Sequence, residues 1–281
     1  MFYLGVKIVT DSAADLPPEL AEELGVTVVS VYLRFGDEVY HDRVDISEDE
    51  FYRRLLHDSI YPSTTQPTPK DFTDAYQKLS QEADGIVSIH ITSRLSGTYS
   101  SAIQGKKSVE DACPIEVIDS ETVSIGTGLI AMEAAKIAAS GKSLQQVVAG
   151  VRQIIPTIRL LILFDTLKYL AKGGRIGKAK ALLGSVLNVK PLLTIEDGEL
   201  LPVAQVRTRA KGIQRLFDFV MNAIDIQDLS ILYSTTPDEA QTLAERVGSI
   251  FPRERITLAR LGPALGVHGG PGVLAIAFRE K

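Results

Sequence analysis

The stretch that decides the fold class reads GIVSIHITSRLSGTYSSA and covers residues 85–102. Its first part, 85–92, is rich in isoleucine and valine and predicts a buried strand. The strand leads directly into Ser96-Gly97-Thr98, where small hydroxyl residues are typical of the start of a helix. Because the first turn of a helix has free N–H groups and the positive end of the helix dipole, this junction predicts an anion-binding site.

Strands and helices alternate on both sides of this unit through residues 1–155. We predict strands at 6–10, 26–35 and 115–120, helices at 18–24, 70–82, 129–139 and 144–155, and a further helix capped by Ser47. Residues 126–128 read as a turn before the helix at 129–139. This alternation predicts an N-terminal α/β domain, 1–155, with a mainly parallel sheet flanked by helices.

A second α/β domain with a mixed sheet is predicted over residues 156–281. Its expected strands are 160–164, 191–195, 200–206, 229–235, 256–261 and 273–278, and its expected helices are 166–171, 208–223 and 237–250. Asp197-Gly198 is a strong signal for a hairpin between two of these strands. A glycine-rich loop is expected at 266–272, and it carries His268.

Hydroxyl side chains follow several of the predicted strands. Ser12, Thr64, Ser96 and Ser120 all stand at or near the carboxyl end of a strand. Ligands of open α/β sheets bind at that edge, so we expect the four loops to form one binding site. Thr64 lies in PSTTQPTP, residues 62–69, which reads either as a stiff row of hydrogen-bond donors or as a turn that caps the next helix with Thr68.

Composition sets the broad class of the protein. The chain has 281 residues, 45% of them hydrophobic, a net charge of −5 and one cysteine. These values indicate a well-cored globular protein in a reducing compartment, without a cysteine metal site and without general affinity for nucleic acid. The first residues lack a signal-peptide pattern, and no apolar run is long enough to span a membrane, so we expect a cytoplasmic protein.

Motifs of common enzymes are missing from the sequence. Residues 173–178, GGRIGK, resemble a phosphate loop but fail its spacing, because Ala179 stands where serine or threonine is needed. No dinucleotide, zinc-protease or nucleophile-elbow motif is present. His41, His57 and His90 read as surface or core residues, whereas His268 is a candidate site residue.

The available polar groups suit holding a carboxyl group better than transforming it. An enzyme remains as the alternative: a hydrolase with Ser96 as nucleophile, or a phosphotransferase that uses residues 168–180. The sequence shows no histidine–carboxylate partner for Ser96. The five basic residues of 168–180 form either a solvated face or a surface for a partner or phosphate.

Five segments together resemble the DegV family of bacterial fatty-acid-binding proteins. They occur in order over essentially the whole chain and read VTDSA at 9–13, TTQP at 64–67, LSGTYSSA at 95–102, YLAKGGRI at 169–176 and HGGPG at 268–272. The family usually has serine where this chain has Thr65, which keeps the hydroxyl and adds a methyl group.

The resemblance implies a two-domain protein of the EDD fold that is a carrier and not an enzyme. One long acyl chain, such as palmitate, would be buried between the domains, with no cofactor or metal. The family's carboxylate ligands fall on Thr64 and Ser96, and His268 would join the same network. Thr65 and Gly97, beside them in the same motifs, are further candidate ligand residues.

The resemblance also implies a protein partner. Family members of the fatty-acid-kinase system present the acyl carboxyl group to a separate kinase, which makes acyl phosphate. Arg207 and Arg209 match a segment implicated in docking that kinase, and their alternation at a predicted strand end has both facing outward. We expect neutral donors at the carboxyl group, without a nearby Lys or Arg, because a tight ion pair would hold back the oxygen that is phosphorylated.

Overall fold

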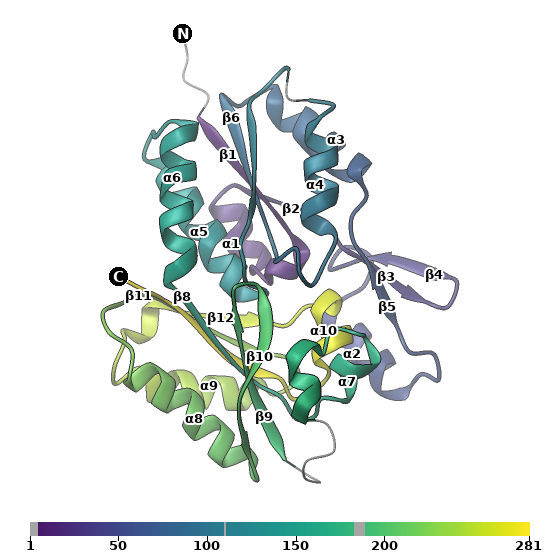
Figure 1. Cartoon of the computed structure of the whole chain (residues 1–281), viewed down its shortest axis with the longest axis vertical. Helices are drawn as coiled ribbons and strands as arrows, with labels where there is room; N and C mark the ends of the chain where they lie inside the picture. The colour runs from purple at the N-terminus through teal and green to yellow at the C-terminus, as the bar shows by residue number, and fades with distance from the viewer. Residues whose placement is uncertain (1–4, 110, 183–188) are drawn as a thin grey trace.

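A parallel sheet of four strands forms the upper half of the molecule in Figure 1. The computed structural model describes residues 5–109, 111–182 and 189–281. The strand order is β2-β1-β6-β7, and every neighbouring pair is parallel. The strands are β1 (Val6–Asp11), β2 (Val26–Val29), β6 (Gly85–His90) and β7 (Ile115–Asp119). The sheet confirms the predicted fold class of the N-terminal half.

Helices cover both faces of this sheet (Figure 1). One face carries α3 (Pro69–Ser80) and α4 (Thr98–Lys106), and the other carries α5 (Ile125–Ala139) and α6 (Leu144–Ile154). Two short helices, η1 (Ser12–Ala14) and α1 (Pro18–Glu23), link β1 to β2. Residues 126–128, which we expected in a turn, lie in the first turns of α5, where all three are buried. That prediction was wrong because buried small residues let the helix pack closely.

A mixed sheet of six strands forms the lower half, in the order β10-β9-β8-β13-β11-β12. The pairs are antiparallel except β11 with β12. The strands are β8 (Ile158–Leu163), β9 (Lys190–Glu196), β10 (Glu199–Val206), β11 (Ile226–Tyr233), β12 (Ile256–Arg260) and β13 (Leu274–Glu280). Asp197 and Gly198 both have positive φ, as the predicted hairpin turn between β9 and β10 requires.

Helices α8 (Arg209–Met221) and α9 (Pro237–Val247) cover the outer face of the six-stranded sheet and share an apolar core with it. The remaining short helices of the described residues are η2 (Ile155–Thr157), α7 (Lys168–Lys172), η3 (Gly177–Leu182), η4 (Arg253–Arg255) and α10 (Pro263–Gly269). The helical geometry of α10 corrects our expectation of a loop around His268. Its start follows the common pattern of a proline in the first turn, and Gly270, at φ +74°, ends it.

Helix α5 lies between the two sheets. It packs against β1 on one side and against β8, β11 and β13 on the other, and a single apolar core runs across both halves. The strands of the parallel sheet all precede residue 155, and those of the six-stranded sheet all follow it. The boundary between the domains at residues 155 and 156 stays a prediction.

A small antiparallel sheet, β4-β3-β5, projects from one side of the parallel sheet (Figure 1). Its strands are β3 (Tyr32–Phe35), β4 (Glu38–His41) and β5 (Ser63–Thr65), and α2 (Glu48–His57) and α10 lie beside it. We expected 26–35 to be one strand. The strand breaks because the N–H of Val31 donates to Ser12 Oγ at 3.0 Å and its carbonyl accepts from Asp42, so this residue leaves the parallel ladder.

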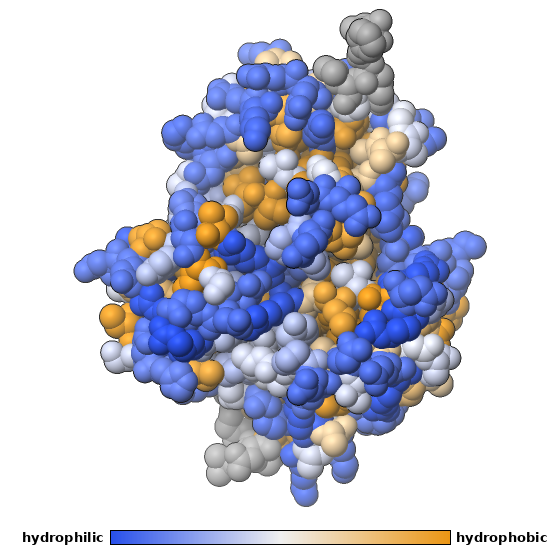
Figure 2. Space-filling view, turned by 180° about the vertical axis from the view of Figure 1, so that it is seen from behind, coloured by the Kyte–Doolittle hydropathy of each residue, from blue (hydrophilic) through white to orange (hydrophobic). Residues whose placement is uncertain are grey.

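The face of the molecule that Figure 2 shows is mostly hydrophilic. Figure 2 shows the molecule from behind, with hydrophobic residues in separate groups among hydrophilic ones. In the residues that the structure describes, no helix is long and apolar enough to cross a membrane.

Candidate functional site

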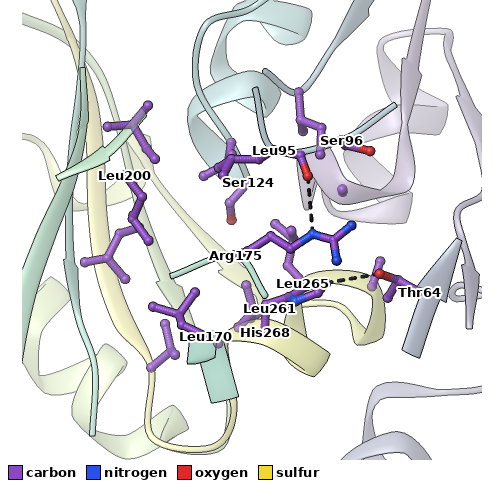
Figure 3. Close-up of a pocket in the computed structure, with 18 of the residues that line it drawn as sticks. Thr64, Leu95, Ser96, Ser124, Leu170, Arg175, Leu200, Leu261, Leu265 and His268 are labelled. Carbon is purple, nitrogen blue, oxygen red and sulfur yellow. Dashed lines mark hydrogen bonds between the residues drawn. The ribbon is translucent and has the colours of Figure 1, made fainter. Parts of the chain in front are cut away.

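A cavity lies between the parallel sheet and the six-stranded sheet (Figure 3). Its empty space is about 950 Å³, the open mouth included, which is within the usual range for ligand pockets. Most of the wall is apolar and comes from both halves of the chain. The apolar lining residues are Ala13, Val31, Ile91, Leu95, Val123, Leu160, Ile162, Phe164, Leu170, Ile195, Leu200, Leu232, Leu261, Ala264, Leu265 and Val273.

Polar side chains gather at one end of the cavity. Thr64, Ser96 and His268 line it there, together with Gln66 and Arg175. Thr64 Oγ1 lies 3.0 Å from His268 Nε2, a hydrogen bond between residues 204 positions apart. The structure therefore brings together the three main residues predicted from the sequence.

Strand β5 positions Thr64. It pairs with β3, with Thr64 opposite Leu33, and successive side chains point to opposite faces. Thr64 consequently lines the cavity, whereas Thr65 is exposed and does not line it. Thr68 caps α3 in a capping box with Asp71. Residues 62–69 therefore include both a side chain that lines the cavity, Thr64, and the predicted helix cap, Thr68.

The start of α4 positions Ser96. Ser96 Oγ accepts from the N–H of Thr98 at 3.2 Å and lies 2.8 Å from the Thr98 hydroxyl. No imidazole of the described residues is bonded to it, as a serine nucleophile would need. Gly97, predicted as a ligand residue, does not line the cavity. A Cβ atom on Gly97 would lie 2.8 Å from Gln66 Nε2, so glycine permits this close packing.

His268 is held in α10 with 9% of its surface exposed. Burial, with a smaller effect of the Arg175 charge, lowers the pKa of His268 from 6.5 to about 4. The imidazole is thus neutral at physiological pH. Its Nδ1 atom is buried without a hydrogen-bond partner in the described chain, and Gly173 packs so closely that a Cβ atom there would lie 2.2 Å from Nδ1.

Arg175 reaches the cavity because of the way α7 ends. Gly174 adopts φ +72°, and the N–H groups of Gly174 and Arg175 donate to Ala171 and Leu170, which is a Schellman motif. The guanidinium group then donates to the carbonyls of Gly173 at 2.9 Å and Leu95 at 3.5 Å (Figure 3). Arg175 therefore lines the same cavity as the residues predicted to bind a carboxyl group, where we had expected no nearby Lys or Arg.

All four predicted loops reach the cavity, but two of the predicted serines do not line it, since Ala13 and Val123 do so in their place. Ser12 and Ser120 are buried and bonded within the protein, to the N–H of Val31 and to Thr127 Oγ1 respectively. Sequence reasoning missed Ser124, which does line the cavity. Nothing in the sequence distinguishes it from the other serines that follow strands.

Three residues elsewhere are aligned like a catalytic triad. Ser88 Oγ lies 2.7 Å from His90 Nε2, and His90 Nδ1 lies 2.9 Å from Asp11 Oδ2. All three are 0% exposed, and none lines the cavity. The Tyr76 hydroxyl also donates to Ser88, so this chain of hydrogen bonds holds the core together.

The basic residues outside the cavity have separate surroundings. The four lysines of 168–180 are exposed, and Lys178 pairs with Glu199. Arg207 is exposed after the end of β10. Arg209 begins α8 instead of continuing a strand, and it pairs with Glu239 at 2.7 Å, which corrects the expectation that both arginines face outward from a strand.

Metal binding is not indicated by the described residues. Among residues 5–109, 111–182 and 189–281, no group of three or more His, Cys, Asp or Glu side chains is placed to hold a metal ion.

Comparison with known proteins places the chain in a family. A family model described as "Uncharacterised protein, DegV family" matches residues 5–281. A DegV domain-containing protein of Caldanaerobacter subterraneus subsp. tengcongensis is 35% identical over 279 residues, which are 98% of this chain and 99% of that protein.

Two solved structures have the same fold. One is described as showing fatty acid binding of a DegV family protein from Thermus thermophilus (TM-score 0.91, 30% identity, 99% of this chain and 100% of that one). The other is a stearic-acid-binding protein from Eubacterium ventriosum (TM-score 0.87, 28% identity, 99% of each chain). The alignment over nearly the whole length shows that the chain belongs to the DegV family.

Proposed function

We propose that the protein binds one long-chain fatty acid, such as palmitate, in the cavity between its two sheets. The observation that carries this proposal is that the polar groups of the cavity are confined to one end. A long apolar wall ends there in a cluster of hydroxyl, imidazole and guanidinium groups. A fatty acid has the same division into an apolar chain and a polar end. The relatives from Thermus thermophilus and Eubacterium ventriosum are described as binding fatty acids.

The head-group site combines neutral donors with one cation. Since His268 Nδ1 has no partner in the described chain, the imidazole proton is better placed on Nε2, where Thr64 Oγ1 accepts it. The Thr64 hydroxyl is then oriented to donate to a carboxyl oxygen. The Ser96 hydroxyl supplies a second donor, and the Arg175 guanidinium balances the charge of the carboxylate.

The tail supplies most of the affinity. A C16 chain has about 14 methylenes, and burial of each contributes about 0.8 kcal/mol, or roughly 11 kcal/mol before ordering costs. The head group therefore needs to fix orientation more than to add affinity. Orientation matters for a carrier, because the carboxyl group has to face the next reactant.

We infer further that the protein presents this carboxyl group to a separate fatty-acid kinase in the cytoplasm and does not itself catalyse a reaction. The absence of a bonded imidazole at Ser96 in the described chain supports a carrier. Arg207 is the better candidate for contact with the kinase, since it is exposed while Arg209 is engaged by Glu239. No cofactor is needed for this role.

The test is to denature the purified protein, extract it with organic solvent and identify lipids by mass spectrometry. We expect one fatty acid per chain. Thr64→Val or Ser96→Ala should weaken binding about ten-fold or more, because each removes a hydrogen bond to a charged group. Thr65→Val is the matched control, since it removes an adjacent exposed hydroxyl that does not line the cavity. An empty extract from folded protein that also fails to bind added palmitate would contradict the proposal.

The carrier role has its own measurement. With ATP and a fatty-acid kinase, acyl phosphate should form only when this protein is present, and Arg207→Ala should slow its formation without changing fatty-acid affinity. Turnover of acyl esters or phosphates by the protein alone, abolished in Ser96→Ala, would favour the enzyme instead.

A further inference from the structure

One hydroxyl group interrupts the apolar wall of the cavity away from the head-group cluster. Ser124 lines the cavity with 3% of its surface exposed, next to Val123 and near Leu95. Figure 3 shows its oxygen directed into the cavity, between Arg175 on the head-group side and Leu200 on the other. An oxygen atom at such a place can accept a hydrogen bond from a bound ligand.

The hydroxyl of Ser124 is not used to cap a helix. Ser124 is the N-cap residue of α5, but its side chain makes no capping hydrogen bond, and its backbone has φ 55° and ψ −143°. Few residues other than glycine adopt this conformation. The side chain instead donates to Asp15 Oδ2 at 2.5 Å.

Asp15 fixes the direction of that hydrogen bond. Its carboxylate is 1% exposed, and its other oxygen, Oδ1, accepts from the N–H of Gly262 at 2.8 Å and from Arg43 at 3.1 Å. Oδ2 is left to accept from Ser124. Above the pKa of Asp15, which burial raises to about 7, the carboxyl group is ionised and the single hydroxyl proton of Ser124 points at it. The acceptor lone pairs of Ser124 Oγ then remain for a group in the cavity.

A methylene group cannot donate to that oxygen, whereas a hydroxyl group can. We propose that the cavity is suited to a fatty acid that carries a hydroxyl group part way along its chain, with this hydroxyl donating to Ser124 Oγ. The inference rests on the proposed fatty-acid binding and specifies its ligand class. The hydroxyl belongs between the two ends of the chain, because Ser124 lies between the head-group cluster and Leu200.

The test compares stearate with a series of monohydroxystearates in which the hydroxyl is moved along the chain. Affinities are measured on delipidated protein for the wild type, Ser124→Ala and Ser124→Gly. In the wild type, we expect one isomer to bind at least as tightly as stearate. In both variants, the affinity of that isomer relative to stearate should fall about ten-fold, because its hydroxyl is buried without a partner.

Two controls separate this effect from misfolding. Ser124→Gly relieves the unusual backbone conformation, so it reports on the missing hydroxyl even if Ser124→Ala is unstable. Ser120→Ala removes a buried serine hydroxyl that does not line the cavity and should leave the ratio unchanged. If stearate binds normally and the affinity of each hydroxystearate relative to stearate is the same in the wild type and both variants, this inference alone is overturned. Failure of the wild type to bind any member of the series would overturn the proposed function with it.

Discussion

Replacing His268 with glutamine should remove a contribution to stability that depends on pH. Burial lowers the pKa of His268 from 6.5 to about 4 in the folded protein. A group whose pKa is depressed by folding stabilises the protein fully above its unfolded pKa, and this stabilisation is lost as the pH falls through the folded value. The change in the pKa of His268 from 6.5 to about 4 corresponds to about 3 kcal/mol. The loss should therefore fall between pH 6.5 and about 4.

The assay is urea unfolding of delipidated wild type and His268→Gln across this pH range. Delipidation is needed because a bound fatty acid also titrates. The free energy of unfolding of the wild type minus that of the variant should fall by about 3 kcal/mol from pH 7 to pH 4. Taking this difference cancels Asp15 and Asp42, whose pKa values are raised by burial to about 7 and 6 and which act in the opposite direction.

Parallel stability curves would refute the reasoning, because they would mean that the imidazole is charged or solvated in the folded protein. His57→Gln is the control, since it removes an exposed histidine at the end of α2. Glutamine at position 268 keeps an amide that can donate to Thr64. A change in fatty-acid affinity can thus be separated from the change in stability.

Further predictions concern two glycines near His268 and the buried carboxyl group of Asp15. Gly173→Ala should displace His268 and lower fatty-acid affinity at least ten-fold, since its Cβ would lie 2.2 Å from Nδ1. Gly174→Ala has open space around its Cβ but φ +72°, so it should cost about 1 kcal/mol of stability in urea unfolding. Because it touches the binding residues only through the position of Arg175, it should lower affinity less than Gly173→Ala, and equal binding losses in both variants would contradict this account. Because burial raises the pKa of Asp15 to about 7, its contribution to wild-type stability should fall by about 4 kcal/mol as the pH rises from 4 through 7. Asp15→Asn should remove this pH dependence of the free energy of unfolding. The same pH dependence in the wild type and the variant would argue against a buried carboxyl group.

Local signals predicted most of the secondary structure. The Asp197-Gly198 turn, the Thr68 cap and the buried strand β6 all form as expected, because each is specified by residues close together in the chain. The break at Val31 could not be predicted in this way. Its cause is a hydrogen bond to Ser12, which lies 19 residues earlier.

The candidate site was predicted less completely than the fold. The motifs identified Thr64, Ser96 and His268, but Arg175 was assigned to a basic surface and Ser124 was missed. Arg175 enters the cavity through the backbone geometry at Gly174, and Ser124 is distinguished by its contact with Asp15, 109 positions away. Long-range packing decides which of several similar side chains faces the ligand, and one sequence does not specify it.

The origin of the head-group residues links ligand binding to the arrangement of the two halves. Thr64 and Ser96 come from the N-terminal half, whereas Arg175 and His268 come from the C-terminal half. At this end of the cavity, the Thr64–His268 and Arg175–Leu95 hydrogen bonds connect the two halves of the chain. A carboxyl group bound by all four residues would add further connections between the halves. A ligand that binds only this arrangement stabilises it in proportion to the logarithm of ligand concentration. In the proposed carrier, the fatty acid would then be part of what holds the two sheets together at this end of the cavity.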